Sequence, residues 1–378
     1  MLSTIENNVS RPERSISILF LIWIALQGIL FLRYGVKTSV DSALYITNAD
    51  DLLKGIFPQG RDVWYISYSI FLAGASLLGG NHVAVLFQVL LSGVALYFLY
   101  RLTHKITKNE ITSLLTCVFY IGWIKIHQWN FFIYTESLFT SMSIISFAGL
   151  VLSKSFKHYT YTFLIFLFTV FVRPTGIALL FGVLVYGFAH FYHRVSRAAW
   201  LSTMALGISL GLLLLNFVMK DYSFIDSYQK GEIIYPNINL GMQPPDELII
   251  PARSTAPLIS FITFIFNNPV YFIKITTIKL LLFLGNAKPY FSLLHNGMIV
   301  GFLFPLYFFA ITGFRHFTTN RNEHYFIAGF VMMQCAIVAF TSENWDGRFL
   351  IPILPFVFML SAVGINQRWS NFYTGRFK

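Results

Sequence analysis

The stretch WYISYSIFLAGASLLGG, Trp64–Gly80, decides how many times the chain crosses a membrane. It is apolar but short, aromatic and rich in Ser and Gly, so it is either a span or a helix at the membrane interface. The choice between these two decides on which side of the membrane every later loop lies. Arg11 and Arg14 come before the first apolar run and place the N-terminus in the cytoplasm, because basic residues gather on that side.

An interfacial helix over Trp64–Gly80 puts the later groups of basic residues on the cytoplasmic side, whereas a span there would move them all outside. The sequence therefore favours the interfacial helix and a ten-span chain, with twelve spans as the alternative. The basic residues concerned are Arg101, Lys105, Lys108, Lys154, Lys157, Arg194, Arg197, Arg315, Arg321, Arg368, Arg376 and Lys378.

The composition is that of a chain dissolved in lipid. Of 378 residues, 56% are hydrophobic and 11% are charged, whereas soluble domains carry about 25% charged residues. The net charge of +11 is scattered over span ends, which indicates topology signals and phosphate partners, so no nucleic acid partner is expected. Cys117 and Cys335 stand alone inside apolar runs and are expected to be buried thiols.

The sequence predicts an all-α polytopic bundle of about ten spans, a single transmembrane domain over 1–378 with both termini inside. The first apolar run has no small-residue cleavage site before its end and is expected to be a retained span. The predicted spans are 16–32, 83–100, 111–126, 131–152, 160–172, 177–192, 198–218, 298–314, 325–340 and 349–365.

Two large outer segments follow from this topology, 33–82 and 219–297. The second contains NPVYFIKITTIKLLLFLG, Asn268–Gly285, which Lys274 and Lys279 interrupt. Placing the later basic loops in the cytoplasm again excludes a span here. The stretch is therefore predicted to be an amphipathic helix on the outer surface, before the eighth span.

Acidic residues crowd the predicted outer side, so chemistry is expected there. Asp41 follows the first span within a few residues, in SVDSALY, and can lie just above the membrane. It could equally be a helix N-cap, as could Ser39. The other outer acids are Asp50, Asp51, Asp62, Glu136, Asp221, Asp226, Glu232, Asp246, Glu247, Glu343 and Asp346.

Two ionisable residues lie within apolar surroundings. Glu136 is predicted one turn into a span, where a charged group is costly and should face the bundle interior or a wet cavity; function and structural pairing are both open. Arg173 lies in VRPTG, a predicted turn recessed in the outer leaflet between short apolar arms. It could satisfy loose carbonyls or hold an anion.

Further cations stand at the outer mouths of late spans. Arg348 lies in DGRFLIPILPF, and KPYFSLLHN contains Lys288, Tyr290 and His295. These residue types grip phosphate through charge-assisted hydrogen bonds. The sequence has no phosphate-binding glycine loop and no metalloprotease or serine-hydrolase motif, and its nine His do not pair at metal spacing. Neither a nucleotide cofactor nor a metal site built from His is therefore expected, and the use of a divalent metal is left open.

The order of these features resembles the GT-C superfamily of membrane glycosyltransferases. The features are an acid after the first span, an apolar stretch ending in GGNH, an RPTG turn and GRFLIPILPF before the last span. Relatives in that superfamily include the protein O-mannosyltransferases and the aminoarabinose transferases of lipid A.

The resemblance implies a polyprenyl-phosphate-linked sugar donor and a glycan, lipid or protein acceptor. It implies that Asp41 is the catalytic base and that Arg348 and Lys288 bind the lipid phosphate. Glu136, from its own position within a predicted span, is a further catalytic candidate. We add Arg173, Tyr290 and His295 as candidate phosphate ligands. Relatives can carry a second acid and a divalent metal, but Ser42 follows Asp41 here. The expected enzyme is a hexosyl- or pentosyltransferase of the plasma (inner) membrane whose active site faces outward.

The chemistry agrees with this residue set. A polyprenyl phosphate leaves as a weakly basic anion and needs no general acid, so one carboxylate to take the acceptor proton and cations to hold the phosphate suffice. The alternatives are a secondary transporter or flippase for a lipid-linked or glycan substrate, a glycan ligase or polymerase, and a non-catalytic scaffold.

Overall fold

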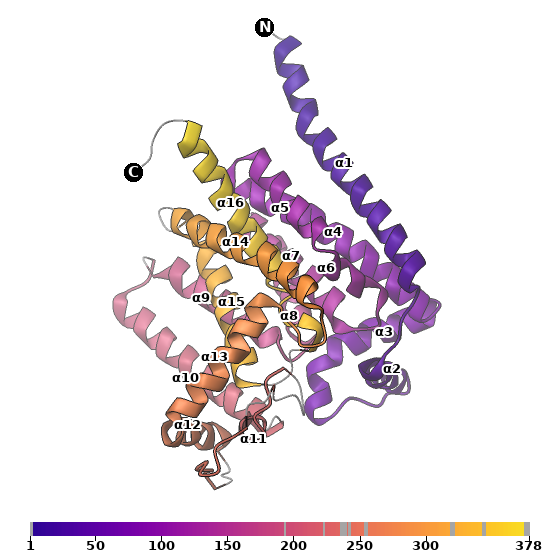
Figure 1. The fold of residues 1–378 in the computed structure, drawn as a ribbon. Coiled ribbons are helices and arrows are strands. Elements are labelled where there is room, and N and C mark those ends of the chain that lie inside the picture. Colours follow the sequence, from indigo (N-terminus) through magenta and orange to yellow (C-terminus); the bar gives the residue numbers. More distant parts are fainter. Residues whose placement is uncertain are drawn as a thin grey trace. The chain divides into compact units, whose positions relative to one another are not determined.

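The computed structural model describes residues 3–192, 194–221, 224–234, 240, 243–252, 256–317, 322–341 and 345–373. Regular structure in these residues is helical, apart from an isolated parallel bridge between Lys37 and Phe132 (Figure 1). The predicted all-α class is confirmed. Four charged residues used in the prediction, Arg321, Glu343, Arg376 and Lys378, lie outside the described residues.

Several helices are long and apolar enough to cross a membrane. Six helices in the described part meet this condition, or seven if one bent helix pair forms a single span. These helices indicate a multi-pass membrane protein. The six segments are Ser15–Tyr34, Asn81–Thr107, Thr135–Leu152, Arg197–Phe217, Leu293–Arg315 and Glu323–Phe340, and the bent pair is Pro257–Asn267 with Pro269–Gly285.

Each of the ten predicted spans contains a helix, but some of those helices are short. The helices α5 (Glu110–Gly122), α8 (Phe156–Val170) and α9 (Gly176–Phe191) have 13, 15 and 16 residues, whereas a straight span needs about 20. The helix α16 (Leu354–Tyr373) ends in a polar segment. The ten-span count therefore stays a prediction.

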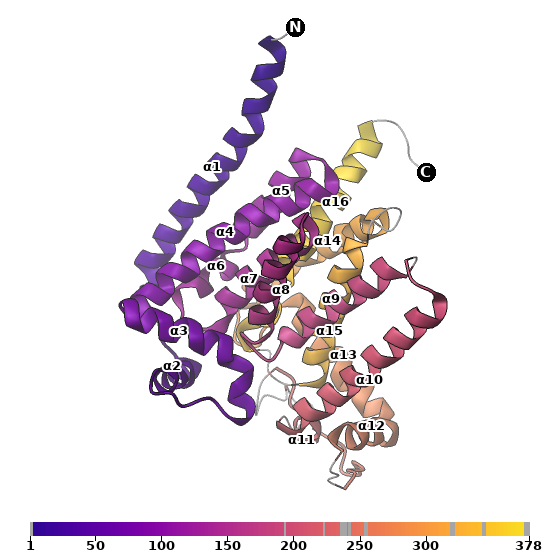
Figure 2. The same cartoon turned by 180° about the vertical axis from the view of Figure 1, so that it is seen from behind.

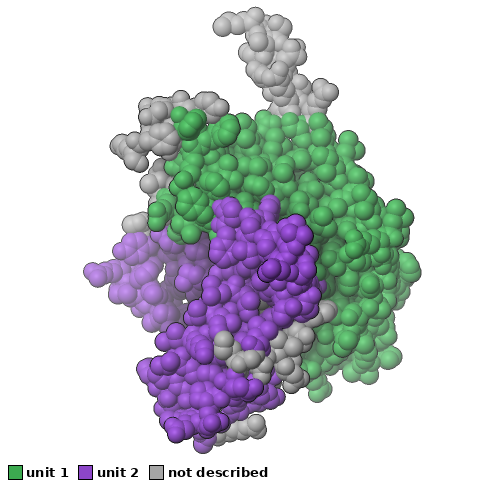
Figure 3. All heavy atoms as spheres, in the orientation of Figure 1, with its two compact units in different colours: residues 1–176, 306–319, 351–378 green, residues 177–305, 320–350 purple. Residues whose placement is uncertain are grey.

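The chain divides into two compact units, coloured green and purple in Figure 3. Unit 1 comprises residues 1–176, 306–319 and 351–378, and unit 2 comprises 177–305 and 320–350. Each unit is described below by itself.

Unit 1 is a helical bundle around α4 (Asn81–Thr107), which packs against α5 and α7 (Thr135–Leu152), as Figures 1 and 2 show. The apolar half of α16 packs against α5 and is buried from Leu354 to Val363. Around this bundle lie α1 (Ser3–Tyr34), α2 (Val40–Leu53), the 3-10 helix Gly60–Tyr65, α3 (Ile66–Leu78), α6 (Ile124–Gln128), the 3-10 helix Trp129–Phe131 and α8.

Two glycines let the end of α14 (Leu293–Phe317) touch α16 inside unit 1. A Cβ on Gly313 would meet the carbonyl oxygen of Leu360, and a Cβ on Gly364 would meet that of Phe309. The hydroxyl of Ser361 donates to the carbonyl oxygen of Leu306 at 2.7 Å. Small residues at such a crossing are typical of helix packing within membranes.

Unit 2 is built around Tyr228 in α11 (Phe224–Gln229). The Tyr228 hydroxyl donates to the carbonyl oxygen of Ala339 at 2.6 Å and accepts a hydrogen bond from the Thr276 hydroxyl at 2.9 Å. The Tyr271 hydroxyl donates to the carbonyl oxygen of Tyr228 at 2.7 Å. These bonds connect α11, α13 (Pro269–Gly285) and α15 (Glu323–Phe340). Unit 2 also holds α9, α10 (Arg197–Asp221), α12 (Pro257–Asn267) and the 3-10 helix Trp345–Gly347.

The predicted surface helix over Asn268–Gly285 has an unexpected distribution of charge. It corresponds to α13, which meets α12 at an angle of 105°. Lys274 is exposed, but Lys279 is buried, while the apolar Val270 and Ile273 are 81% and 63% exposed. This arrangement does not favour an amphipathic surface helix, because a charged residue faces inward and apolar residues face outward.

Candidate functional site

Asp41 is positioned by backbone pairing between the segment after α1 and the segment before α7. Gly35 ends α1 with a φ of 57°, and the chain then runs extended. The backbone N–H of Lys37 donates to the carbonyl oxygen of Phe131 at 2.8 Å, and the N–H of Ile133 donates to the carbonyl oxygen of Lys37 at 2.9 Å. These two bonds form the parallel bridge and hold the start of α2 beside residues 131–134.

Ser39 is the N-cap residue of α2, and Asp41 lies in the first turn. The backbone N–H of Ser39 donates to the Ser42 hydroxyl at 2.9 Å, and that hydroxyl donates to the carbonyl oxygen of Ile133 at 3.0 Å. The N–H of Asp41 donates to the Tyr134 hydroxyl at 3.4 Å. Of the two capping alternatives, Ser39 therefore takes the cap position. The carboxylate of Asp41 is partly exposed and lies at the positive end of the helix dipole.

Tyrosines pack beneath Asp41. The ring of Tyr45 lies 5.2 Å from those of Tyr65 and Tyr68 and 6.1 Å from that of Tyr134. Tyr45, Tyr68 and Tyr134 are buried. Burial and, secondarily, the charge of Glu136 raise the pKa of Tyr68 well above its usual value. Tyr68 therefore keeps its proton and donates to the side-chain oxygen of Gln88 at 3.2 Å.

A buried chain of amides ties this region to α1 and α4. The side-chain amide of Gln88 donates to the carbonyl oxygens of Asn130 and Phe132, each at 2.9 Å. The Asn130 amide donates to Gln27 at 2.9 Å, and the Ser137 hydroxyl donates to Asn130 at 2.6 Å. Sequence analysis missed these residues. The available signal was the presence of Gln27 and Gln88 within apolar helices, where polar groups are costly unless they are hydrogen-bonded.

Glu136 and Arg173 form a buried ion pair. Nη1 of Arg173 lies 3.1 Å from Oε1 of Glu136, and their side chains are 3% and 0% exposed. Helix α7 begins at Thr135, so Glu136 lies in its first turn and not one turn into the helix, as the predicted span implied. For Glu136 the structure shows the structural pairing, and the partner of Arg173 is this carboxylate, which neither alternative for Arg173 named. Their catalytic and phosphate-binding roles stay predictions.

The turn that carries Arg173 has the predicted form. Helix α8 ends at Val170 and α9 begins at Gly176, so VRPTG is the connection. A Cβ on Gly176 would meet the backbone of Val170, which explains the glycine. The carbonyl oxygen of Phe171 in this turn accepts the N–H of Ser67 at 3.1 Å.

The remaining predicted phosphate ligands lie in unit 2, on two segments that touch. The Tyr290 hydroxyl accepts the N–H of Asp346 at 3.2 Å. A Cβ on Gly347, whose φ is 71°, would meet the side chain of Asn286. The loop of Lys288 and Tyr290 therefore packs on the turn that precedes Arg348.

The four predicted phosphate ligands of unit 2 differ in how far their side chains are exposed. Lys288 is buried, and its backbone exchanges hydrogen bonds with the Asn296 side chain at 3.0 and 2.8 Å. Tyr290 and His295 are exposed, whereas Arg348 is partly exposed and lies 6.0 Å from the centre of the Phe349 ring. Asp41, Glu136 and Arg173 belong to unit 1 and these four residues to unit 2.

A buried lysine in unit 2 was not predicted as a site residue. The Lys279 ammonium lies 4.2 Å from the centre of the Tyr228 ring, and the side chain is 1% exposed. Within the described part of the chain its nitrogen has no hydrogen-bond partner. The buried carboxylate of Glu232 is close enough to interact with its charge. An ionisable side chain buried in an apolar helix marks a functional position by default.

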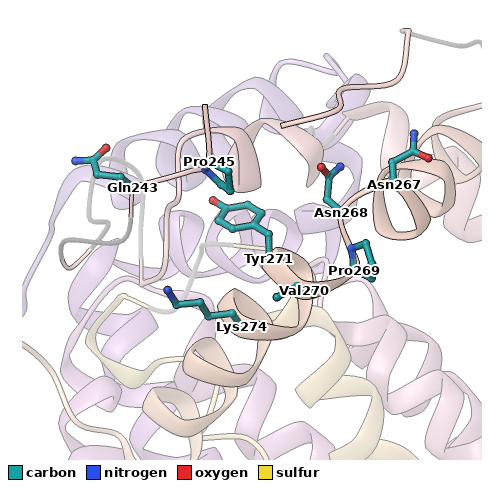
Figure 4. Close-up of a pocket in the computed structure, with 8 residues that line it drawn as sticks. All are labelled: Gln243, Pro245, Asn267, Asn268, Pro269, Val270, Tyr271 and Lys274. Atoms are coloured by element: carbon teal, nitrogen blue, oxygen red, sulfur yellow. The ribbon is translucent and has the colours of Figure 1, made fainter. Parts of the chain in front are cut away.

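A hollow of about 420 Å³ lies at the bend between α12 and α13 (Figure 4). Asn267 to Lys274 form one side, and Gln243 and Pro245 come from the preceding loop. Asn268 closes this loop onto the bend, because its side chain bonds to both backbone groups of Ile249, at 3.0 and 2.8 Å.

Among the described residues, no group of three or more His, Cys, Asp and Glu lies close enough together to hold a metal ion. Comparison with known proteins adds no assignment: no family model and no curated protein matches the sequence.

Proposed function

We propose that the protein is an integral-membrane glycosyltransferase of the GT-C type. It transfers a sugar from a polyprenyl-phosphate donor to an acceptor on the extracytoplasmic face of the plasma membrane. The single observation that carries this proposal is the position of Asp41. A partly exposed carboxylate stands in the first turn of α2, directly after a helix long and apolar enough to cross the membrane.

In the proposed reaction the acceptor hydroxyl gives its proton to the Asp41 carboxylate while its oxygen attacks the anomeric carbon. The bond from that carbon to the phosphate oxygen breaks, and polyprenyl phosphate leaves with the electron pair. A single displacement inverts the anomeric centre. Cations hold the departing lipid phosphate, since charge-assisted hydrogen bonds are the strong ones. The ligands predicted from the sequence, Lys288, Arg348, Tyr290, His295 and Arg173, stay predictions. The sugar is a hexose or a pentose.

The test is an assay of the purified protein with several polyprenyl phosphate sugars that measures released polyprenyl phosphate. We expect Asp41→Asn to lower turnover by about 100-fold or more, because general-base catalysis contributes roughly 10² to 10⁴ in rate, while donor binding persists. Asp50→Asn is the matched control, because Asp50 is an exposed carboxylate on the same helix. Equal activity of the two variants would contradict the proposal.

The second candidate is a secondary transporter or flippase for a lipid-linked or glycan substrate. Two features of unit 2 favour it: the 105° break between α12 and α13, and the buried Lys279 on α13. Broken helices with buried ionisable groups are typical of transport sites. Flux of a labelled lipid-linked sugar across proteoliposomes, lost in Lys279→Met and kept in Asp41→Asn, would select this candidate.

A further inference from the structure

Three cations at the C-terminal end of α1 lie against aromatic rings. The Lys37 ammonium is 5.9 Å from the centres of both the Tyr34 and Phe132 rings. The Arg33 guanidinium is 5.5 Å from the Tyr34 ring, and the Lys125 ammonium is 5.9 Å from the Trp129 ring. Each distance is within the range of a cation–π interaction.

The rings form a continuous row that connects the three cations, with Tyr34 and Phe132 partly exposed at the surface and Trp129 buried. The Phe132 ring lies 5.9 Å from Tyr34 and 5.2 Å from Trp129. We call this surface the cation–aromatic strip; its members are Arg33, Tyr34, Lys37, Phe132, Trp129 and Lys125. All six residues belong to unit 1.

The centre of the strip is rigid in its backbone and exposed in its charge. The parallel bridge fixes Lys37 and Phe132 opposite each other. The side chains of Arg33 and Lys37 are exposed, and within the described residues neither forms an ion pair with a carboxylate. Exposed cations that pair with no carboxylate in the described part of the chain are suited to bind an external anion.

The neighbouring side chains indicate where that anion comes from. Leu32 and Val40 are 88% and 86% exposed, and Phe31 is 50% exposed. The strip therefore adjoins bare apolar surface at the end of the candidate span Ser15–Tyr34. Aromatic rings and long cationic side chains at a span end lie at the level of the lipid headgroups, where apolar neighbours contact acyl chains.

We propose that the cation–aromatic strip binds the phosphate headgroup of an anionic membrane phospholipid, with Leu32 and Val40 against its acyl chains. Arg33 and Lys37 supply the charge-assisted hydrogen bonds, and Lys125 extends the positive field. A soluble acidic protein or a nucleic acid would meet the same charges but would leave the apolar residues in water. The site is independent of the proposed glycosyl transfer.

The test measures lipid binding and not activity. The purified full chain in detergent micelles is titrated with phosphatidylglycerol, and bound lipid is counted by native mass spectrometry. We expect the double variant Arg33→Gln/Lys37→Gln to weaken binding roughly tenfold or more, because each cation near an anionic lipid surface contributes about a fivefold factor. Parallel titrations use phosphatidylcholine, inorganic phosphate and polyglutamate, which should bind weakly.

Lys54→Gln/Arg61→Gln is the matched control, because it removes two exposed cations from elsewhere in unit 1. The charge-conserving variant Arg33→Lys/Lys37→Arg should retain most of the binding. If the double variant does not fold, the single variant Lys125→Gln is titrated in its place and should also bind phosphatidylglycerol more weakly. An equal loss in the control, no loss in the double variant, or tight binding of inorganic phosphate or polyglutamate would overturn the proposal.

Discussion

Glu136 and Arg173 are 3.1 Å apart at their charged atoms and are both buried, although they are 37 positions apart along the chain. The pair connects the first turn of α7 to the VRPTG turn after α8. A buried ion pair stabilises little relative to an apolar pair, but removing one partner leaves an uncompensated charge. Removing one of the two charges should therefore destabilise the protein more than replacing both of them with apolar side chains.

Glu136→Gln is expected to destabilise the protein by about 3–5 kcal/mol, the usual cost of breaking a buried pair. Arg173→Gln should have a similar effect, and the double variant should cost less than the sum of the two. Thermal unfolding in detergent measures these changes, with Asp50→Asn as an exposed control. Additive effects in the double variant would show that the two charges do not interact.

His127 predicts a dependence of stability on pH. Burial lowers its pKa to about 4, although its ring nitrogen also hydrogen-bonds to the carbonyl oxygen of Tyr120 at 3.0 Å. The unfolded chain has the ordinary pKa of about 6.5 and binds more protons between pH 6.5 and 4. The contribution of neutral His127 to the free energy of unfolding is therefore fully present above pH 6.5. It falls as the pH drops toward 4, by up to about 3 kcal/mol.

Unfolding midpoints measured from pH 7 to pH 4 test this contribution. In His127→Gln the decline over this interval should be smaller than in the parent protein. A parallel decline in both proteins would assign the pH dependence to other groups.

Gly176→Ala is expected to destabilise the protein by about 1–3 kcal/mol, the usual range for overpacking. The added Cβ would meet the backbone of Val170, which cannot turn aside as a side chain can. Gly187→Ala is the matched control in the same helix α9, because no atom lies within 4 Å of its Cβ position. The control should be neutral or more stable, since alanine favours helix over glycine by about 1 kcal/mol.

Lys279→Met is expected to keep or raise the unfolding midpoint, because it replaces a buried ammonium with an apolar side chain of similar length. A variant that gains stability but loses transfer or flux would identify Lys279 as a functional residue, since function is often maintained at a cost in stability. Lys274→Met provides the comparison at an exposed lysine of the same helix. A large loss of stability in Lys279→Met would show that the lysine has a structural role.

The sequence predicts the helices well because apolar run length is a local property. A helix lies at every predicted span, and the turn at Arg173–Gly176 follows from Pro and Gly. The partners of the site residues could not be predicted, because they come from distant segments. The bridge of Lys37 to Phe132, the pairing of Glu136 with Arg173 and the contact of Tyr134 with Asp41 all depend on how helices pack.

Local signals also misplaced one helix boundary and the exposure of one lysine. The apolar run from Phe131 suggested a helix through Glu136, but the backbones of Phe131 and Ile133 bond to Lys37 in the segment after α1, and the helix starts only at Thr135. Lys274 and Lys279 suggested a surface helix, but the second lysine faces the core. In both places tertiary contacts outweigh the local pattern.

The bridge at Lys37 makes the spacing along this part of the chain as important as the identity of its side chains. The distance from Lys37 to Asp41 is set by main-chain pairing, so exchanging side chains at the paired positions leaves the carboxylate where it is. Adding or deleting one residue between them would instead turn the start of α2 by about 100°. The length of this linker is therefore constrained independently of the side chains that it carries.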